Sequence, residues 1–110
     1  MVKQGDIIML DISPTLGSEQ SGYRPAIVLS SNLTISKTKI ISICPITSNK
    51  KRSGFNIPLC DKTKTQGVAL CAHHRSVDLS VRPYKIVEQL PKDKLYEILS
   101  AVISTITPSE

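Results

Sequence analysis

The stretch GDIIMLDISPTLGSEQSGYRPAIVLS, residues 5–30, contains two apolar runs separated by a long polar segment. The apolar runs are rich in Ile, Leu and Val, which favour β-strands. Pro25 has no N–H to give to a strand ladder, so it is expected at the start of the second strand. We therefore predict a strand over residues 6–12, a polar loop over residues 15–25 and a second strand over residues 25–31.

Further apolar runs downstream of this stretch predict additional strands. Residues 38–46 are dense in β-branched side chains and are predicted to form a central strand. Shorter runs predict strands at residues 55–59, 68–74 and 84–90, and Pro58 restricts the first of these to a sheet edge or a bulge. Residues 31–36 are expected to form a turn, and residues 76–83 a single helical turn.

The apolar period changes near the C-terminus. One face of an α-helix is formed, at helical spacing, by Leu95, Ile98, Leu99, Val102, Ile103 and Ile106. Pro91 suits the first helical position, Asp93 the first turn, and Pro108 ends the helix. We expect the apolar face to close one opening of a barrel. The predicted fold is mainly β with a C-terminal α-helix, a small SH3-like barrel of five to six strands.

Length and composition fit one domain over residues 1–110 with a modest core. With one Phe and no Trp, the core must be aliphatic, and a core of that size favours dimerisation. The N-terminal apolar run is too short for a signal peptide, and no stretch approaches the roughly 20 apolar residues of a membrane span. A cytoplasmic protein with no membrane contact is expected.

Charge is concentrated in the middle of the chain. The segment from residue 37 to residue 64 contains a single acidic residue, Asp61. Its basic residues are Lys37, Lys39, Lys50, Lys51, Arg52, Lys62 and Lys64. Such a segment attracts polyanions. The alternative is a solvated lysine face that keeps the protein soluble.

The three cysteines, Cys44, Cys60 and Cys71, form no CxxC pair, so neither a disulfide framework nor a zinc knuckle is expected. On a strand, Cys71 and His73 would share a face, and with His74 they form the one cluster that could be considered for a metal. Reduced, buried or half-buried thiols are the favoured interpretation. No metal and no cofactor is predicted.

The opening stretch resembles the N-terminal signature of MazF/PemK-type toxins: Gly-Asp opening a strand, Asp-x-x-Pro, Gly-Ser-Glu-Gln-x-Gly-x-Arg-Pro, and an apolar strand. The segment ICPITSNKK, residues 43–51, resembles that family's strand ending in Pro-x-Thr. The segment GVALCAHHRSVDLSVR, residues 67–82, resembles its Gly-x-Val/Ala-Leu strand with a following basic residue, Ser/Thr and a later Arg. The similarity extends from about residue 4 to residue 106.

This resemblance implies the toxin half of a type II toxin–antitoxin pair. Such toxins are homodimeric SH3-like barrels that cut single-stranded RNA, mostly mRNA, at short sequences without a metal ion. The cognate antitoxin inhibits them with an acidic, flexible tail that lies along the RNA-binding surface. Metal-free cleavage uses the RNA's own 2′-hydroxyl as nucleophile and leaves a 2′,3′-cyclic phosphate and a 5′-hydroxyl. DNA is not an expected partner.

Three residues are expected to carry the chemistry. By resemblance Arg24 is the catalytic arginine; its guanidinium can bind two phosphoryl oxygens, and Pro25 restricts its backbone to extended conformations. The alternative is a surface arginine paired with Glu19. Thr47 matches the threonine of Pro-x-Thr and could donate to a phosphoryl oxygen, or could simply bond the backbone at a strand end. Glu19 could accept the 2′-proton or hold Arg24.

Substrate contacts are expected from Gln20, Gly22, Tyr23, Ser48, Lys50, Lys51, His73 and Arg75. Gly22 permits a positive φ, and Tyr23 could stack on a base or anchor the loop. The family commonly has an acidic residue and then Gln where this chain has Ala72 and His73. His73 could contact base edges, titrate near neutral pH, or be polar surface only. Arg75 could serve phosphate or structure.

Two other functions are weighed against the endoribonuclease. Related CcdB-like barrel toxins poison DNA gyrase, but they place bulky aromatic residues at a C-terminus that here reads TITPSE. A non-catalytic barrel that binds RNA or a partner is the other alternative, because Ala72 and His73 depart from the family pattern. The presence of Arg24 and Thr47 argues against this alternative.

Overall fold

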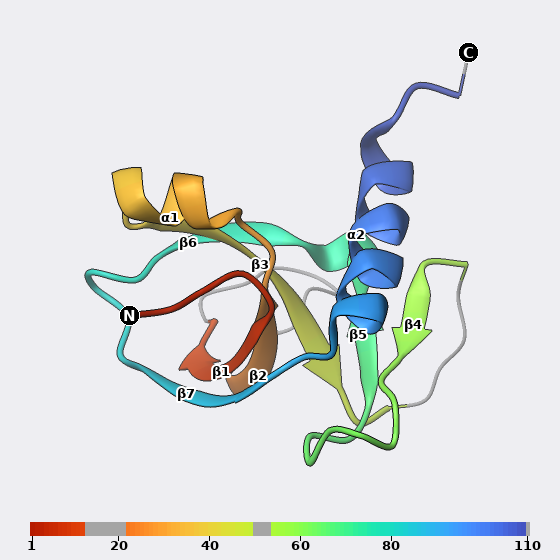
Figure 1. Ribbon diagram of the computed structural model, residues 1–110, viewed down its shortest axis with the longest axis horizontal. Helices are drawn as coiled ribbons and strands as arrows, with labels where there is room; N and C mark the ends of the chain where they lie inside the picture. The colour runs from red at the N-terminus through yellow and green to blue at the C-terminus, as the bar shows by residue number, and fades with distance from the viewer. Residues whose placement is uncertain (13–21, 50–53, 110) are drawn as a thin grey trace.

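The computed structural model describes residues 1–12, 22–49 and 54–109. The elements in chain order are β1 (Asp6–Asp11), β2 (Tyr23–Val28), α1 (Asn32–Lys37), β3 (Ile40–Thr47), β4 (Asn56–Pro58), β5 (Val68–Leu70), the 3₁₀ turn η1 (Cys71–His73), β6 (Arg75–Asp78), β7 (Tyr84–Gln89) and α2 (Lys92–Ile106) (Figure 1). The fold is mainly antiparallel β with a C-terminal helix, as predicted from the sequence.

The central strand is β3. The strands pair in the order β4-β5-β3-β2-β1-β7, and β6 also pairs with β3. Because Ile43 lies opposite both Val28 of β2 and Arg75 of β6, these two strands occupy different edges of β3. The prediction of a central strand here is confirmed, and β4, which ends at Pro58, is at the sheet edge as expected.

The predicted strand over residues 68–74 is confirmed only over Val68–Leu70, and the predicted helical turn over residues 76–83 is wrong because β6 extends to Asp78. This part of the chain forms two strands along one edge of β3, separated by η1, so the sheet built from the described residues has seven strands rather than five or six. Ile46 lies opposite Ala69, and that register would place Ile43 opposite Ala72. Ile43 instead lies opposite Arg75, and η1 takes up the intervening residues.

Two boundaries near the N-terminus also differ from the prediction. The expected turn at residues 31–36 is the short helix α1, whose N-cap Ser31 accepts a hydrogen bond from the Thr34 N–H at 3.2 Å. Strand β2 begins at Tyr23, before Pro25. Proline is tolerated there because pairing with β3 begins only at the next residue, Ala26.

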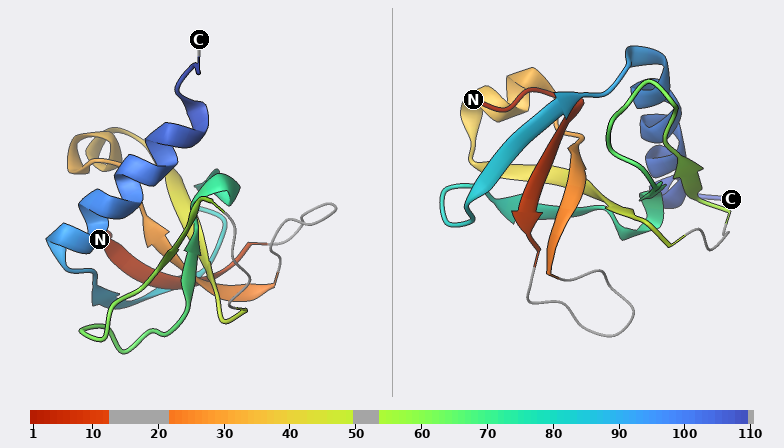
Figure 2. Two further views of the ribbon diagram at one scale, coloured as in Figure 1. Left: turned by 90° about the vertical axis from the view of Figure 1, so that its right-hand side faces the viewer. Right: turned by 90° about the horizontal axis from the view of Figure 1, so that it is seen from below.

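Side-chain alternation along the strands sorts the core into two clusters, one on each face of the sheet. The first contains Ile7, Ile27, Leu29, Cys44, Ile46, Ala69, Cys71 and Leu90 with Leu95, Ile98 and Val102 of α2. The second contains Val2, Ile8, Leu10, Ile12, Ala26, Val28, Ile41, Ile43 and Val77. Figure 2 shows α2 lying beside β4 on one side of the strands.

Only part of the predicted apolar face of α2 is buried. Leu95, Ile98 and Val102 pack into the first cluster, whereas Ile103 is 57% exposed and Ile106 is 66% exposed. Pro91 occupies the N-cap rather than the first helical position. The helix ends at Ile106 because Thr107, which precedes Pro108, is extended.

Candidate functional site

Arg24 lies on β2 and Thr47 lies on β3, and these two strands are neighbours in the sheet. The paired residues of β2 and β3 end at Ala26 and Pro45; if this register continued for two more residues along each strand, Arg24 would be opposite Thr47. Opposite residues in an antiparallel pair project to one face. That face belongs to the second core cluster, because Arg24 is also opposite Leu10 of β1. Continuation of the register would therefore bring a cation and a hydroxyl side by side on this face.

Thr47 is the last residue of β3 and is 6% exposed. Its Oγ1 accepts a hydrogen bond from the Asn49 N–H at 3.1 Å. A hydroxyl has one proton to donate as well as lone pairs to accept with. The backbone bond expected of a strand-end threonine is thus present, and it leaves the hydroxyl proton available for another acceptor.

The backbone of Thr47 is closely approached by Gly67, which precedes β5. Gly67 has a φ of +133°, and a Cβ at this position would lie 2.4 Å from the Thr47 carbonyl oxygen. Only glycine fits such a contact. Gly67 was not among the residues predicted to support the site, although it opens the GVALCAHHR segment.

Two arginines hold the end of β1. The Nη1 of Arg75 donates to the Ile12 carbonyl oxygen at 2.9 Å, and the Nη1 of Arg82 donates to the Asp11 carbonyl oxygen at 2.6 Å. Arg75 thus has a structural contact, while a guanidinium has further N–H donors that can face a substrate. Arg82 was not among the predicted site residues; the only sequence signal for it is the arginine that closes the SVDLSVR segment.

Residues 22 and 23 follow the polar segment. Gly22 has a φ of +88°, as expected, and its carbonyl oxygen accepts a hydrogen bond from the Ile12 N–H at 3.0 Å. Tyr23 is opposite Asp11 and is 62% exposed, so most of its ring is accessible for stacking. Ser48, the residue after β3, is also exposed.

The two histidines differ in their surroundings. His74 approaches α2, with its Nε2 3.3 Å from the Thr105 Oγ1. His73 lies in η1 and is half-buried; its Nδ1 is buried and has no hydrogen-bond partner among the described residues. The Nδ1 of His73 therefore has no hydrogen-bond partner among the described residues, whereas His74 contacts α2.

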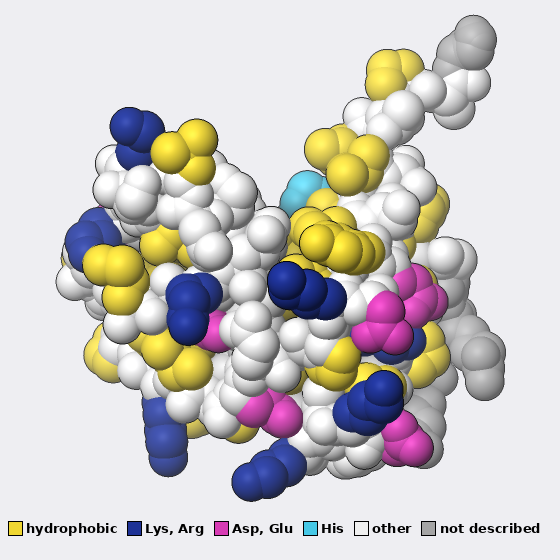
Figure 3. Space-filling model, in the orientation of Figure 1, with side chains coloured by type: hydrophobic (Ala, Val, Ile, Leu, Met, Phe, Trp, Pro, Cys, Tyr) yellow, Lys and Arg dark blue, Asp and Glu magenta, His cyan; other side chains and the backbone are white. Residues whose placement is uncertain are grey.

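Four predicted site residues, Glu19, Gln20, Lys50 and Lys51, lie outside the described residues. Among the described basic residues of the middle segment, Lys37 ends α1 and Lys39 precedes β3, whereas Lys62 and Lys64 lie between β4 and β5. Figure 1 shows α1 and β4 on opposite sides of the molecule, and basic side chains are scattered across the face seen in Figure 3. The described lysines therefore do not form one patch.

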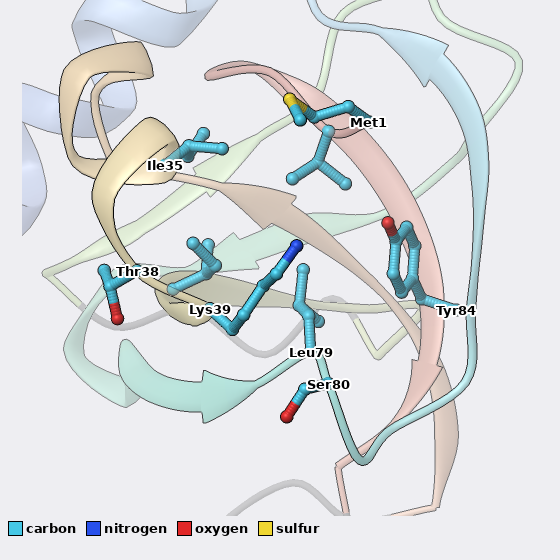
Figure 4. A pocket seen from close by; sticks show the side chains of 9 residues that line it. Met1, Ile35, Thr38, Lys39, Leu79, Ser80 and Tyr84 are labelled. Carbon is cyan, nitrogen blue, oxygen red and sulfur yellow. The ribbon is translucent and has the colours of Figure 1, made fainter.

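A small cavity of about 140 Å³ lies between α1, the N-terminus and the start of β7 (Figure 4). Lys39 and Tyr84 border it, together with apolar side chains that include Ile35 and Leu79. Ligand pockets usually measure about 300–1,000 Å³, and neither Arg24 nor Thr47 lines this cavity. It is therefore separate from the candidate site.

The described chain contains no group of three or more His, Cys, Asp or Glu side chains placed to hold a metal ion. All three cysteines are free. Of the helices described, none has both the length and the apolar character needed to cross a membrane.

Comparison with known proteins places this fold in a family. Residues 3–106 match the model of the PemK-like, MazF-like toxin of type II toxin–antitoxin systems. The endoribonuclease PemK of Escherichia coli is 27% identical over 110 residues, covering 96% of this chain and 83% of that protein. The endoribonuclease toxin MazF of Escherichia coli K12 is 40% identical over 73 residues, covering 66% of this chain and 65% of that protein.

Solved structures agree with this match. A crystal structure of MazF from Deinococcus radiodurans has a TM-score of 0.86 and 33% identity, covering 94% of both chains. A MazE–MazF crystal structure from the same organism has a TM-score of 0.81 and 29% identity, covering 98% of this chain and 97% of that one. This chain belongs to the PemK-like, MazF-like toxins of type II toxin–antitoxin systems.

Proposed function

We propose that this MazF/PemK-type endoribonuclease toxin cleaves single-stranded RNA at selected sequences, without a metal ion, by attack of the RNA's own 2′-hydroxyl. The observation that supports this most directly is the placement of Arg24 and Thr47. They lie on the neighbouring strands β2 and β3, and continuing the β2–β3 register by two residues would bring them opposite one another, where one phosphodiester could contact both. Both residues also lie in the segments that match the family model.

In the proposed reaction a bond forms between the 2′-oxygen and phosphorus, and the bond from phosphorus to the 5′-oxygen breaks. Negative charge grows on the non-bridging oxygens, where the Arg24 guanidinium binds it with two parallel hydrogen bonds. The Thr47 hydroxyl donates its proton to the same phosphoryl group. Glu19 accepts the 2′-proton, and the departing 5′-oxygen gains a proton, leaving a 2′,3′-cyclic phosphate and a 5′-hydroxyl.

Sequence selectivity is assigned to side chains around this pair. The exposed Tyr23 ring stacks on a base, and the half-buried His73 contacts a base edge. Gln20, Ser48, Lys50 and Lys51 add base and phosphate contacts, and Gly22 lets the backbone approach the RNA. Arg75 binds the end of β1 and directs its remaining donors to phosphate. Because Ala72 replaces a carboxylate, we expect a preferred sequence different from that of relatives that keep the acidic residue.

The fold, assembly and location are part of the same proposal. Arg75 and Arg82 tie β6 and the segment after it to the end of β1, which supports closure of the sheet into an SH3-like barrel. The protein acts in the cytoplasm as a homodimer. A cognate antitoxin with an acidic tail covers the RNA-binding surface, as the existence of a MazE–MazF complex for a relative suggests.

The test is incubation of the purified protein with a long single-stranded RNA in excess EDTA. We expect discrete cuts whose 3′ fragments accept phosphate from polynucleotide kinase without prior phosphatase treatment, as 5′-hydroxyl ends do. Cutting that requires added Mg²⁺, or fragments with 5′-phosphates, would contradict the mechanism. RNA that is bound but remains intact would show a non-catalytic binding protein.

A further inference from the structure

Cys44 and Cys71 both lie in the interior of the protein. Both are 0% exposed and belong to the first core cluster. Ile46 is opposite Ala69 and Thr47 is opposite Val68 in the β3–β5 ladder. If this register continued for two more residues, to the first residue of η1, Cys44 would be opposite Cys71.

The local contacts keep both thiols between the sheet and α2. The Cys71 Sγ approaches the carbonyl oxygens of Ala69, at 3.8 Å, and of Ile98 in α2, at 4.0 Å. The Cys71 N–H still bonds across the sheet to Phe55, at 3.1 Å, so the backbone at this point keeps its place in the sheet. Directly opposite residues have Cα atoms about 4.5–5.5 Å apart, within the roughly 4.4–6.8 Å that a disulfide spans.

We propose that Cys44 and Cys71 form a redox-active dithiol that a small peroxide oxidises to a cross-strand disulfide within the folded protein. The bond would join β3, three residues before Thr47, to η1, which carries His73. It would therefore fix together two segments that border the candidate site. The proposal does not depend on the RNA-cleaving function, because the disulfide either forms or does not form whatever the protein cleaves.

The two thiols have different parts in the reaction. A hydrogen bond from Cys44 lowers the pKa of the Cys71 thiol, against the opposing effects of burial and of the Glu97 charge. The same contact with Cys71, together with burial, raises the pKa of the Cys44 thiol well above its ordinary value. Cys71 therefore ionises first, and the thiolate is the nucleophile towards an oxidant.

The steps balance as a two-electron oxidation. The Cys71 thiolate attacks one oxygen of hydrogen peroxide, the O–O bond breaks, and the products are Cys71 sulfenic acid and, after protonation, water. The Cys44 sulfur then attacks the Cys71 sulfur, the S–O bond breaks, and the hydroxyl leaves as a second water molecule. Two thiols lose two protons and two electrons, and the peroxide is reduced to water.

The experiment uses the Cys60→Ser protein, which removes the partly exposed third cysteine and leaves the core intact. The folded variant is treated with hydrogen peroxide and then denatured in the presence of an alkylating reagent. It is then digested and analysed by mass spectrometry. We expect one disulfide-linked peptide pair that joins Cys44 to Cys71, with neither thiol alkylated. When the oxidised protein is reduced with dithiothreitol before alkylation, both cysteines should be recovered as alkylated thiols. The urea midpoint of the oxidised protein should rise relative to its own reduced form.

Two results would overturn the proposal. One is the recovery of both cysteines as alkylated thiols after a peroxide treatment that oxidises a partly exposed thiol, such as Cys60 in the wild-type chain. The other is a disulfide that forms only in urea concentrations that unfold the protein, because it would then arise from the unfolded chain. Neither result bears on RNA cleavage, so failure here and failure of the proposed function are distinguishable.

Discussion

The Nη1 of Arg75 donates a hydrogen bond to the carbonyl oxygen of Ile12, 2.9 Å away, and so links the first residue of β6 to the residue that follows β1. Ile12 is fully buried, so its carbonyl oxygen would be poorly hydrated without this donor. The bond also lies at the edge of the polar segment that precedes Arg24. Arg75, which was expected either to bind phosphate or to have a structural role, therefore has a definite structural contact.

Replacement of Arg75 by Met should destabilise the protein. Met keeps most of the apolar stem but removes the donor, and losing a charged hydrogen-bond donor to a buried acceptor costs about 1.5–3 kcal/mol. Urea unfolding of the wild type and of R75M measures this cost. Arg82→Met is the matched comparison, because its bond to Asp11 is in an exposed setting; its effect should be smaller, and an R75M protein as stable as the wild type would contradict the assigned contact.

Gly67→Ala should be strongly destabilising. A Cβ here would lie 2.4 Å from the Thr47 carbonyl oxygen, and the φ of +133° is unfavourable for alanine. We expect a loss of roughly 2–4 kcal/mol in the free energy of unfolding, with RNA cleavage reduced even at temperatures where the variant is folded. Gly54→Ala is the control, since a Cβ added there would meet nothing within 4 Å; equal effects from the two substitutions would refute the steric argument.

Glu88 should make the stability of the folded protein depend on pH. Burial raises the pKa of its carboxyl group, but hydrogen bonds from the Thr65 hydroxyl and from the Lys64 and Thr65 N–H groups, with the Lys64 charge, outweigh burial and lower the pKa. A carboxylate whose pKa is lowered by folding stabilises the fold at pH values above its pKa in the unfolded chain, which is about 4.3 for glutamate. This stability is lost as the pH falls through the folded pKa.

The measurement is thermal or urea unfolding of the wild type and of Glu88→Gln between neutral pH and pH 3. Asp78 also has a lowered pKa, owing first to the Ser80 hydroxyl, so the difference between the two proteins isolates Glu88. We expect the variant to be less stable at neutral pH and the difference to shrink as the pH falls. A difference that stays constant over this range would show that Glu88 ionisation does not hold the loop.

The uncovered part of α2 should contribute to a dimer. Apolar side chains follow α2 on the face seen in Figure 3, and Ile103 and Ile106 are more than half exposed. We expect Ile103→Glu to weaken self-association in sedimentation equilibrium by about tenfold or more, because it buries a charge in the interface. Ser104→Glu, on the exposed neighbouring residue, should leave association nearly unchanged; equal effects, or a monomeric wild type, would exclude this face.

The sequence predicted those features that follow from local patterns. The β-branched run that became β3 and the helical spacing of Leu95, Ile98 and Val102 are signals within single segments, and both elements formed. The end of β5 at Leu70 and the strand β6 were mispredicted because the break between β5 and β6 is set by their register against β3. No local pattern encodes that register. The exposure of Ile103 was missed for a similar reason, since spacing shows which residues share a face but not what covers them.

The candidate site was predictable only in part. Arg24 and Thr47 were named from the resemblance, yet their relationship depends on how β2 pairs with β3. The contacts of Arg75 with Ile12 and of Arg82 with Asp11 join residues far apart in sequence, and Gly67 matters because of the carbonyl oxygen it faces. Such contacts appear only when the chain is folded. The catalytic roles of Arg24 and Thr47 are predictions.

The most direct test of the central claim is a double-mutant cycle for RNA cleavage in EDTA with Arg24→Lys, Thr47→Val and the double variant. Each single substitution should slow cleavage, by about 10²–10³-fold where a preorganised donor to the developing charge is lost. If both side chains act on one phosphate, the double variant should be clearly faster than the product of the two single effects predicts. Effects that multiply fully, or a Thr47→Val variant that cleaves as fast as the wild type, would contradict the account.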